Sequence, residues 1–280
     1  MRLSQRVVLY YIRTRIGLLA SFSKKAAAKK ALELFCTPQY RNKKKLPRIF
    51  EAAEKISFSF HGTVIQGYRW NKTSPKKLLI LHGFESSVIN FDRYISPLIK
   101  KDYCILAFDA PAHGRSTGKR INVAIYKELI NYINAQYGPV TNFIAHSMGG
   151  LALSVTIEEW EHDASYKLVL IAPATETTTA ANSLFKLLRL NNSIRKEFDS
   201  LIHQAGHNPI SWFSVSRAAA NIKANVLWFH DRDDELTPLS DVLPVMGQQY
   251  QNFTFHITDG LGHRRIYRDN KVSSAIIDFF

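Results

Sequence analysis

Short apolar runs of strand length recur along the chain, and segments with helical spacing of apolar residues separate them. These runs cover residues 77–81, 103–109, 140–145, 167–172, 225–230 and 252–257. Upstream, residues 56–60 and 63–70 flank His61-Gly62 and predict an antiparallel hairpin. Strands that alternate with helices pair in parallel and are covered on both faces. The pattern therefore predicts an α/β fold with a mostly parallel eight-stranded sheet.

The hexapeptide Ala145-His-Ser-Met-Gly-Gly150 lies where a predicted strand passes into a predicted helix. Small residues two positions before and after the serine, Ala145 and Gly149, suit a tight turn with strained backbone. Such a turn exposes the hydroxyl of Ser147 and directs the first N–H groups of the helix toward the same point. The motif predicts a serine nucleophile, although an ordinary strand–helix turn explains it equally well when it is taken alone.

A serine nucleophile needs a base, which in this kind of sheet follows both the serine and the acid. His256 and His263 are the histidines that follow every candidate acid. His256 lies inside an alternating strand, where we expect a structural role. His263 follows the glycine-punctuated loop Asp259-Gly-Leu-Gly262 at the end of that strand, and it is the predicted base.

Four carboxylates crowd the loop that follows the strand at 225–230. Asp234 is the preferred partner of His263, ahead of Asp233, with Asp231 and Glu235 behind them. We expect most of the others to be solvated turn residues that cap the helix beginning near Pro238. One buried carboxylate against the histidine would hold the imidazole in the required tautomer and stabilise the imidazolium.

Five motifs, in this order, resemble those of the α/β-hydrolase family. They are Leu81-His-Gly-Phe84, Asp109-Ala-Pro-Ala-His-Gly-Arg-Ser116, Ala145-His-Ser-Met-Gly149, His230-Asp-Arg-Asp-Asp-Glu-Leu-Thr-Pro238 and Gly260-Leu-Gly-His263. The resemblance runs from about Lys55 to the C-terminus. It aligns the family's acid with Asp234, although Asp231 replaces the usual glycine. It also implies that the backbone N–H groups of Phe84 and Met148 form the oxyanion hole. We expect His113 and His146 to be structural.

The resemblance implies a serine hydrolase that acts by acyl transfer, with Ser147 as nucleophile, His263 as base and Asp234 as its orienting acid. A carboxylic ester is the expected small-molecule acyl substrate. Thioesters and N-terminal peptide amides are alternatives that use the same groups. The rival from another class is a non-catalytic protein of this fold that binds a lipid or a protein. Ser147 excludes the aspartate nucleophile of the dehalogenase branch.

Residues 173–221 interrupt the strand–helix alternation where members of the family insert a cap. The stretch is rich in apolar side chains, including those of residues 184–190 and Trp212-Phe213. We expect cap helices packed over a pocket for an aliphatic acyl chain, or alternatively helices packed on the body without contacting substrate. We expect no cofactor and no metal, because His203 and His207, at i and i+4, lack further ligands.

The net charge of +14 is concentrated at the N-terminus. Residues 1–50 hold 13 Lys and Arg and one acidic residue, a net charge of +12, so +2 remains for the other 230 residues. We predict a basic helical extension over 1–50 and a hydrolase domain over 51–280. No apolar run in the extension reaches the length of a membrane span, and Arg13 and Arg15 interrupt any signal-peptide core.

The basic extension has three candidate roles. It packs on the body with solvated basic faces, or it lies on an anionic membrane surface. Nucleic-acid binding is disfavoured because no recognised motif accompanies the charge. Cys36 and Cys104 are the only cysteines, which predicts a reducing, cytoplasmic location, with peripheral contact at the inner membrane surface as an addition.

Overall fold

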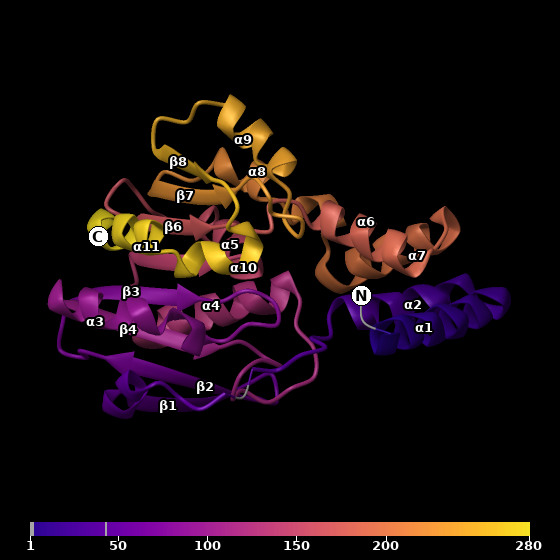
Figure 1. The fold of residues 1–280 in the computed structure, drawn as a ribbon, viewed down its shortest axis with the longest axis horizontal. Helices are drawn as coiled ribbons and strands as arrows, with labels where there is room; N and C mark the ends of the chain where they lie inside the picture. The colour runs from indigo at the N-terminus through magenta and orange to yellow at the C-terminus, as the bar shows by residue number, and fades with distance from the viewer. Residues whose placement is uncertain (1–2, 43) are drawn as a thin grey trace. The chain divides into compact units, whose positions relative to one another are not determined.

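An eight-stranded sheet forms the larger of the two units into which the chain divides (Figure 1). The computed structural model describes residues 3–42 and 44–280. The larger unit comprises Pro38–Thr175 and Ser214–Phe280, and the smaller one comprises the residues up to Thr37 together with Glu176–Phe213. The smaller unit thus joins two segments that lie far apart in the sequence.

The strand order of the sheet is β1-β2-β4-β3-β5-β6-β7-β8. The strands are β1 (Glu54–Phe60), β2 (Thr63–Trp70), β3 (Lys76–Leu81), β4 (Tyr103–Asp109), β5 (Asn142–His146), β6 (Lys167–Ile171), β7 (Asn225–Asp231) and β8 (Phe253–Thr258). β2 pairs antiparallel with β1 and with β4, and every other pair is parallel. The predicted α/β class and mostly parallel sheet are confirmed, because all eight expected strands form with their ends within two residues of the prediction.

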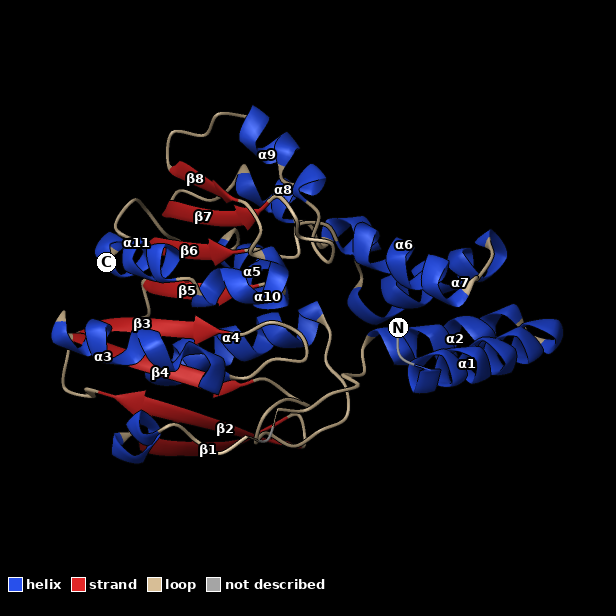
Figure 2. Ribbon diagram, in the orientation of Figure 1, coloured by secondary structure: helices blue, strands red, loops and turns tan. Residues whose placement is uncertain are grey.

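Helices cover both faces of the sheet (Figure 2). Those of the larger unit are α3 (Asp92–Lys100), α4 (Val123–Tyr137), α5 (Met148–Ile157), α8 (Val215–Ala219), α9 (Leu243–Gly247), α10 (Gly262–Arg265) and α11 (Asn270–Phe279). α3 and α11 lie on one face, and α4, α5 and α8 lie on the other. α5 is buried all round, as its uniformly apolar sequence requires, and this holds its first turn rigidly beneath the carboxyl end of β5.

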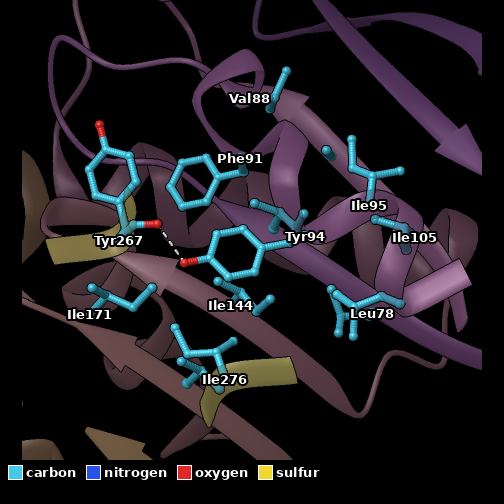
Figure 3. Packing of buried hydrophobic residues seen from close by; sticks show 14 of the residues in the cluster. Leu78, Val88, Phe91, Tyr94, Ile95, Ile105, Ile144, Ile171, Tyr267 and Ile276 are labelled. Atoms are coloured by element: carbon cyan, nitrogen blue, oxygen red, sulfur yellow. Dashed lines mark hydrogen bonds between the residues drawn. The ribbon is translucent and has the colours of Figure 1, made fainter. Parts of the chain in front are cut away.

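The core beneath α3 and α11 joins side chains from both helices and from the sheet (Figure 3). Tyr94 of α3 is fully buried there, and its hydroxyl donates a 2.6 Å hydrogen bond to the carbonyl of Tyr267. Burial also raises the pKa of Tyr94 well above its usual value, so the phenol stays neutral. A buried hydroxyl with a partner avoids the cost of an unsatisfied polar group.

Four α-helices lie among the described residues of the smaller unit: α1 (Leu3–Phe22), α2 (Lys24–Phe35), α6 (Thr177–Leu188) and α7 (Asn192–Gly206). Its core is built around Phe198 of α7, whose ring meets the rings of Phe35 and Phe185 edge-on at centroid distances of 5.7 and 5.1 Å. The guanidinium of Arg13 donates to the carbonyl of Leu187 near the end of α6, with Nε and Nη2 at 3.0 and 2.7 Å. The N-terminal helices therefore share one core with the inserted helices.

Within the described ranges, no helix is both long enough and apolar enough to cross a bilayer.

Candidate active site

Ser147 lies on the sharp turn between β5 and α5, with φ of 54° and ψ of −123°. This backbone conformation is strained for a residue with a side chain and is typical of functional turns. A Cβ atom at Gly149 would lie 2.8 Å from the carbonyl oxygens of Leu81 and His82, and one at Gly83 would lie 2.7 Å from Cβ of Ser147. Both glycines are required because the backbone after β3 touches the serine turn.

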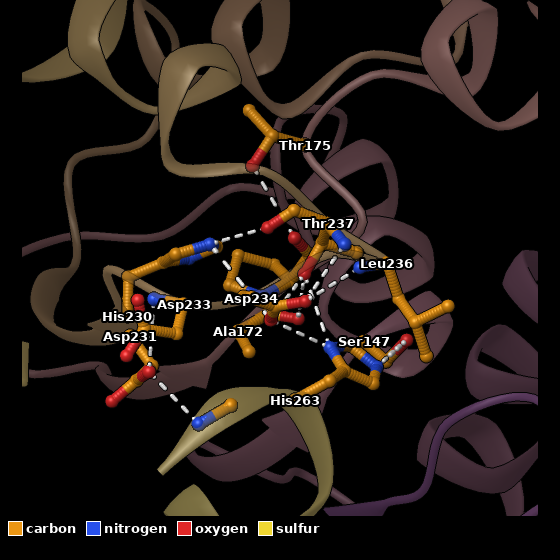
Figure 4. Close-up of polar contacts among 12 residues, drawn as sticks. Ser147, Ala172, Thr175, His230, Asp231, Asp233, Asp234, Leu236, Thr237 and His263 are labelled. Atoms are coloured by element: carbon orange, nitrogen blue, oxygen red, sulfur yellow. Dashed lines mark hydrogen bonds and ion pairs between the residues drawn. The ribbon is translucent and has the colours of Figure 1, made fainter. Parts of the chain in front are cut away.

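Ser147, His263 and Asp234 lie together at the carboxyl ends of β5, β8 and β7 (Figure 4). His263 Nε2 is 2.9 Å from Ser147 Oγ, and His263 Nδ1 is 2.7 Å from Asp234 Oδ2. A neutral imidazole with its proton on Nδ1 satisfies both hydrogen bonds, because Nδ1 then donates to the carboxylate and Nε2 accepts from the hydroxyl. This arrangement can take a proton from Ser147 and hold it.

The carboxylate of Asp234 has no exposed side-chain surface and is surrounded by donors. The N–H groups of Leu236 and Thr237 donate to Oδ1, each at 2.9 Å, and the Thr237 hydroxyl donates to Oδ2 at 2.8 Å. Burial alone would raise the pKa of Asp234, but the hydrogen bonds from His263 and Thr237 outweigh it and lower the pKa below its usual value. Asp234 is therefore ionised at neutral pH.

The other carboxylates of this loop point elsewhere. Asp233 and Glu235 are exposed, and Asp233 Oδ2 accepts a 3.0 Å hydrogen bond from the N–H of Gly260. Asp231 is fully buried. Among the described residues, Asp234 is the one carboxylate of this loop that hydrogen-bonds to the ring of His263.

Asp231 connects the acid loop to the loop that carries His263. Its Oδ1 accepts from the N–H groups of Asp233 at 3.0 Å and Gly262 at 2.8 Å. Its Oδ2 accepts from the N–H of Leu261 at 3.0 Å and from the hydroxyl of Thr258 at 2.7 Å. Burial raises the pKa of Asp231, but these four hydrogen bonds outweigh that effect and lower it. Sequence reasoning ranked Asp231 only as a candidate acid; its one distinguishing signal was that it stands where the family has glycine.

The predicted oxyanion donors lie on two segments beside Ser147. Met148 is the first residue of α5, so its N–H has no acceptor within the helix. Phe84 follows Gly83, the residue whose backbone closely approaches Ser147. The structure thus brings both segments to the nucleophile, and the roles of the two N–H groups stay a prediction.

Two buried histidines hold the loop that carries Phe84. His82 Nδ1 donates to the carbonyl of Gly83 at 2.8 Å, and its Nε2 accepts from the N–H of Ala110 at 3.0 Å. His113 Nε2 accepts from the N–H of Glu85 at 3.0 Å. Burial lowers the pKa of His82 to about 4 and that of His113 to about 3, so both rings stay neutral and keep a nitrogen that can accept. The sequence motif contained His82 but did not reveal this bracing.

His146, the residue before the nucleophile, contacts the histidine loop. Its Nε2 donates to the carbonyl of His263 at 3.0 Å, and the two rings lie 4.7 Å apart. Burial and the nearby His263 ring lower the pKa of His146 well below its usual value. A neutral His146 adds no cationic charge beside the imidazolium that His263 would form.

The other histidines considered from the sequence lie on other elements. His256 is exposed on β8, where its ring stacks on Phe229 at 5.0 Å. His203 and His207 lie near the C-terminal end of α7. Over residues 3–42 and 44–280, no three His, Cys, Asp or Glu side chains gather closely enough to hold a metal ion.

Comparison with known proteins places this site in context. A family model described as "Serine aminopeptidase, S33" matches residues 73–225. The chain is 28% identical over 109 residues to the "Uncharacterized hydrolase YugF" of Bacillus subtilis, and 27% identical over 103 residues to a "Probable serine hydrolase" of Drosophila melanogaster. These matches cover 37% and 35% of the chain and span only 40% and 31% of the length of the two relatives.

Solved structures share the fold over most of the chain. An esterase of Pyrococcus furiosus superposes with a TM-score of 0.63 at 22% sequence identity, covering 87% of this chain and 96% of the esterase.

Proposed function

Because the chain belongs to the family described as serine aminopeptidase S33 and has the α/β-hydrolase fold, we propose that it cleaves a carboxylic ester by acyl transfer from Ser147. One observation carries the proposal: an unbroken hydrogen-bonded series runs from Asp234 through His263 to Ser147 on a strained turn. Each link has the length expected of a nucleophile, a base and an orienting acid.

The acylation step follows from these distances. Ser147 Oγ attacks the ester carbonyl while its proton passes to His263 Nε2, and the carbonyl oxygen becomes an oxyanion. The N–H groups of Phe84 and Met148 donate to that oxyanion, and each raises kcat by a factor of about 10²–10³. The tetrahedral intermediate then collapses, the ester C–O bond breaks, and His263 gives its proton to the departing alkoxide oxygen.

Deacylation repeats the same chemistry with water. His263 takes a proton from the water molecule that attacks the acyl-enzyme carbonyl, and it returns that proton to Ser147 Oγ as the acid leaves. Asp234 remains ionised throughout, since its hydrogen bonds hold its pKa low. It stabilises the imidazolium that appears in both steps.

Activity-based labelling tests the proposal directly. A fluorophosphonate should label the native chain at Ser147, and Ser147→Ala should abolish both the labelling and the cleavage of p-nitrophenyl esters. Absence of labelling, together with no ester cleavage above background by the native chain, would support the rival, a non-catalytic binding protein. Ester cleavage that Ser147→Ala leaves unchanged would rule out Ser147 as the nucleophile.

The same series of groups could act on thioesters or on N-terminal peptide amides, and the name of the family model makes the amide worth measuring. We place the ester first, and a panel of p-nitrophenyl esters, acyl thioesters and aminoacyl anilides ranks the three classes by kcat/KM. A cytoplasmic location, expected from Cys36 and Cys104, and a peripheral contact with an anionic membrane surface are further proposals.

A further inference from the structure

Helix α1 has apolar side chains on two faces. Its inner face packs Ile12, Ile16 and Leu19 into the core of the smaller unit. Its outer face carries apolar residues that are 57–84% exposed. These residues, here called the outer stripe, are Val7, Val8, Tyr11, Leu18 and Phe22. A helix that covers a core on one side is ordinarily polar on the other, so the outer stripe is unexplained by folding.

The outer stripe runs along one side of the helix, with Arg15 between Tyr11 and Leu18. At about 100° per residue, positions 7, 11, 18 and 22 fall within roughly 60° of one another, and position 8 borders them. Phe22, at the end of α1, is 84% exposed. A row of exposed apolar side chains of this kind marks a surface that binds something.

Exposed cations lie on α1 and on α2, the helix that follows it. Arg6 and Arg15 lie on α1, and Lys24, Lys25 and Lys29 lie in the first half of α2; all five are exposed. The guanidinium of Arg15 rests 5.7 Å from the ring centroid of Tyr11, where the apolar and charged surfaces meet. Residues 1–37 contain one acidic residue, Glu33, and it pairs with Lys30 at 3.0 Å. The complementary partner is therefore apolar and negatively charged.

A groove of about 520 Å³ runs along α1 next to the outer stripe. Thr14 and Ser21 line it on α1, and Arg189 and Asn191 line it from the turn between α6 and α7. Arg13 and Lys24 add two more cationic side chains. The groove supplies hydroxyl, amide and cationic donors at the edge of an apolar surface, which is the arrangement found at the level of lipid headgroups.

We propose that the outer stripe and the exposed cations of α1 and α2 dock the protein on an anionic membrane surface. The stripe enters the boundary between headgroups and acyl chains, and the Arg and Lys side chains meet the lipid phosphates. A second copy of the chain is the less favourable occupant, because a symmetric pair would bring Arg6, Arg15 and the α2 lysines of both copies together. The proposal is independent of the reaction at Ser147.

Vesicle co-sedimentation of the full-length chain tests this proposal. The protein should pellet with vesicles of mixed phosphatidylcholine and phosphatidylglycerol, bind phosphatidylcholine alone much more weakly, and dissociate at high salt. The double variant Leu18→Ser, Phe22→Ser should lower the partition coefficient by about tenfold or more. The double variant Lys24→Gln, Lys25→Gln should weaken binding to the anionic vesicles and leave binding to phosphatidylcholine vesicles unchanged. Both pairs of residues are exposed, so the variants should keep the native helical content, which circular dichroism measures.

Matched controls use exposed residues of the larger unit. Leu243→Ser and Lys271→Gln should bind as the native protein does, because Leu243 is 54% exposed and Lys271 is also exposed. Two results would overturn the proposal. One is equal vesicle binding by the native chain and the Leu18→Ser, Phe22→Ser variant. The other is a concentration-dependent dimer, measured by sedimentation velocity, that this variant abolishes while the native chain binds no vesicles.

Discussion

The main-chain N–H of Gly262, the residue before His263, donates a 2.8 Å hydrogen bond to Oδ1 of Asp231. Through this contact a carboxylate on the acid loop fixes the start of the helical turn that presents the histidine. Asp231 stands where the α/β-hydrolase family usually has glycine, so this chain has a clamp between two loops that a glycine could not form. The position of His263 relative to Ser147 therefore depends on a residue that touches neither of them.

Asp231→Asn should lower kcat by about tenfold to a hundredfold and leave KM nearly unchanged. The amide keeps one acceptor oxygen but presents N–H groups to donors, so the loop bearing His263 shifts, and displacements near 1 Å cost up to about 10² in rate. Steady-state kinetics on a p-nitrophenyl ester measures the separation of kcat from KM. Thr258→Val removes one of the four hydrogen bonds and should give a smaller loss; a larger loss than in Asp231→Asn would contradict the clamp.

Asp234→Asn should reduce kcat by about 10⁴, because an asparagine would favour the wrong tautomer of His263 and leave the imidazolium unstabilised. Asp233→Asn and Glu235→Gln are the matched controls, since both residues are exposed in the same loop. They should retain kcat within a few-fold. A larger loss in Asp233→Asn than in Asp234→Asn would reassign the acid.

Gly83→Ala should abolish most activity, because its Cβ would lie 2.7 Å from Cβ of Ser147 and 2.8 Å from Nδ1 of His146. The loop after β3 must retreat, and the N–H of Phe84 moves with it, so an oxyanion donor worth about 10²–10³ in kcat is lost. Gly247→Ala on α9 is the control, since no atom outside its immediate chain neighbourhood lies within 4 Å of the added methyl. Equal activity in the two variants would show that the loop tolerates the displacement and does not position the donor.

Local patterns predicted most of what the sheet contributes and little of what connects distant segments. The β5–α5 turn, His263 and the acid loop could be located because each follows an apolar run whose period and flanking glycines are local signals. The shared core of the helical unit could not be predicted. Three alanines of α2 pack in it, Ala27, Ala28 and Ala31, and they give no periodic signal that α7, some 170 residues away, is their partner. The clamp at Asp231 is likewise a long-range contact, visible in the sequence only as a departure from a family pattern.

Acid should destabilise the fold more steeply than surface histidines alone would. Burial lowers the pKa of His82 to about 4 and of His113 to about 3, and it also lowers the pKa of His146 and of His230. Below the unfolded value of about 6.5, the unfolded chain binds protons at these four sites that the folded chain excludes. Their contribution to stability is therefore complete above pH of about 6.5 and is lost as the pH falls toward the folded values.

Urea unfolding at a series of pH values between about 7 and 5 measures this effect. The free energy of unfolding should fall by several kcal/mol over that range, and its slope should approach the uptake of about four protons. His113→Gln should flatten the slope by about one proton. His256→Gln, at an exposed position, is the matched control. A slope that His113→Gln leaves unchanged would mean that this ring is already charged in the folded protein.

Phe198→Ala should destabilise the helical unit by about 3–5 kcal/mol, because it empties a fully buried site between Phe35 and Phe185. Phe22→Ala removes the same atoms from an 84% exposed site and should cost no more than about 0.5 kcal/mol. Urea unfolding followed by circular dichroism compares the two, since this unit is wholly helical in its regular structure. If Phe198→Ala were as stable as Phe22→Ala, the N-terminal helices and the inserted helices would not share a cooperative core.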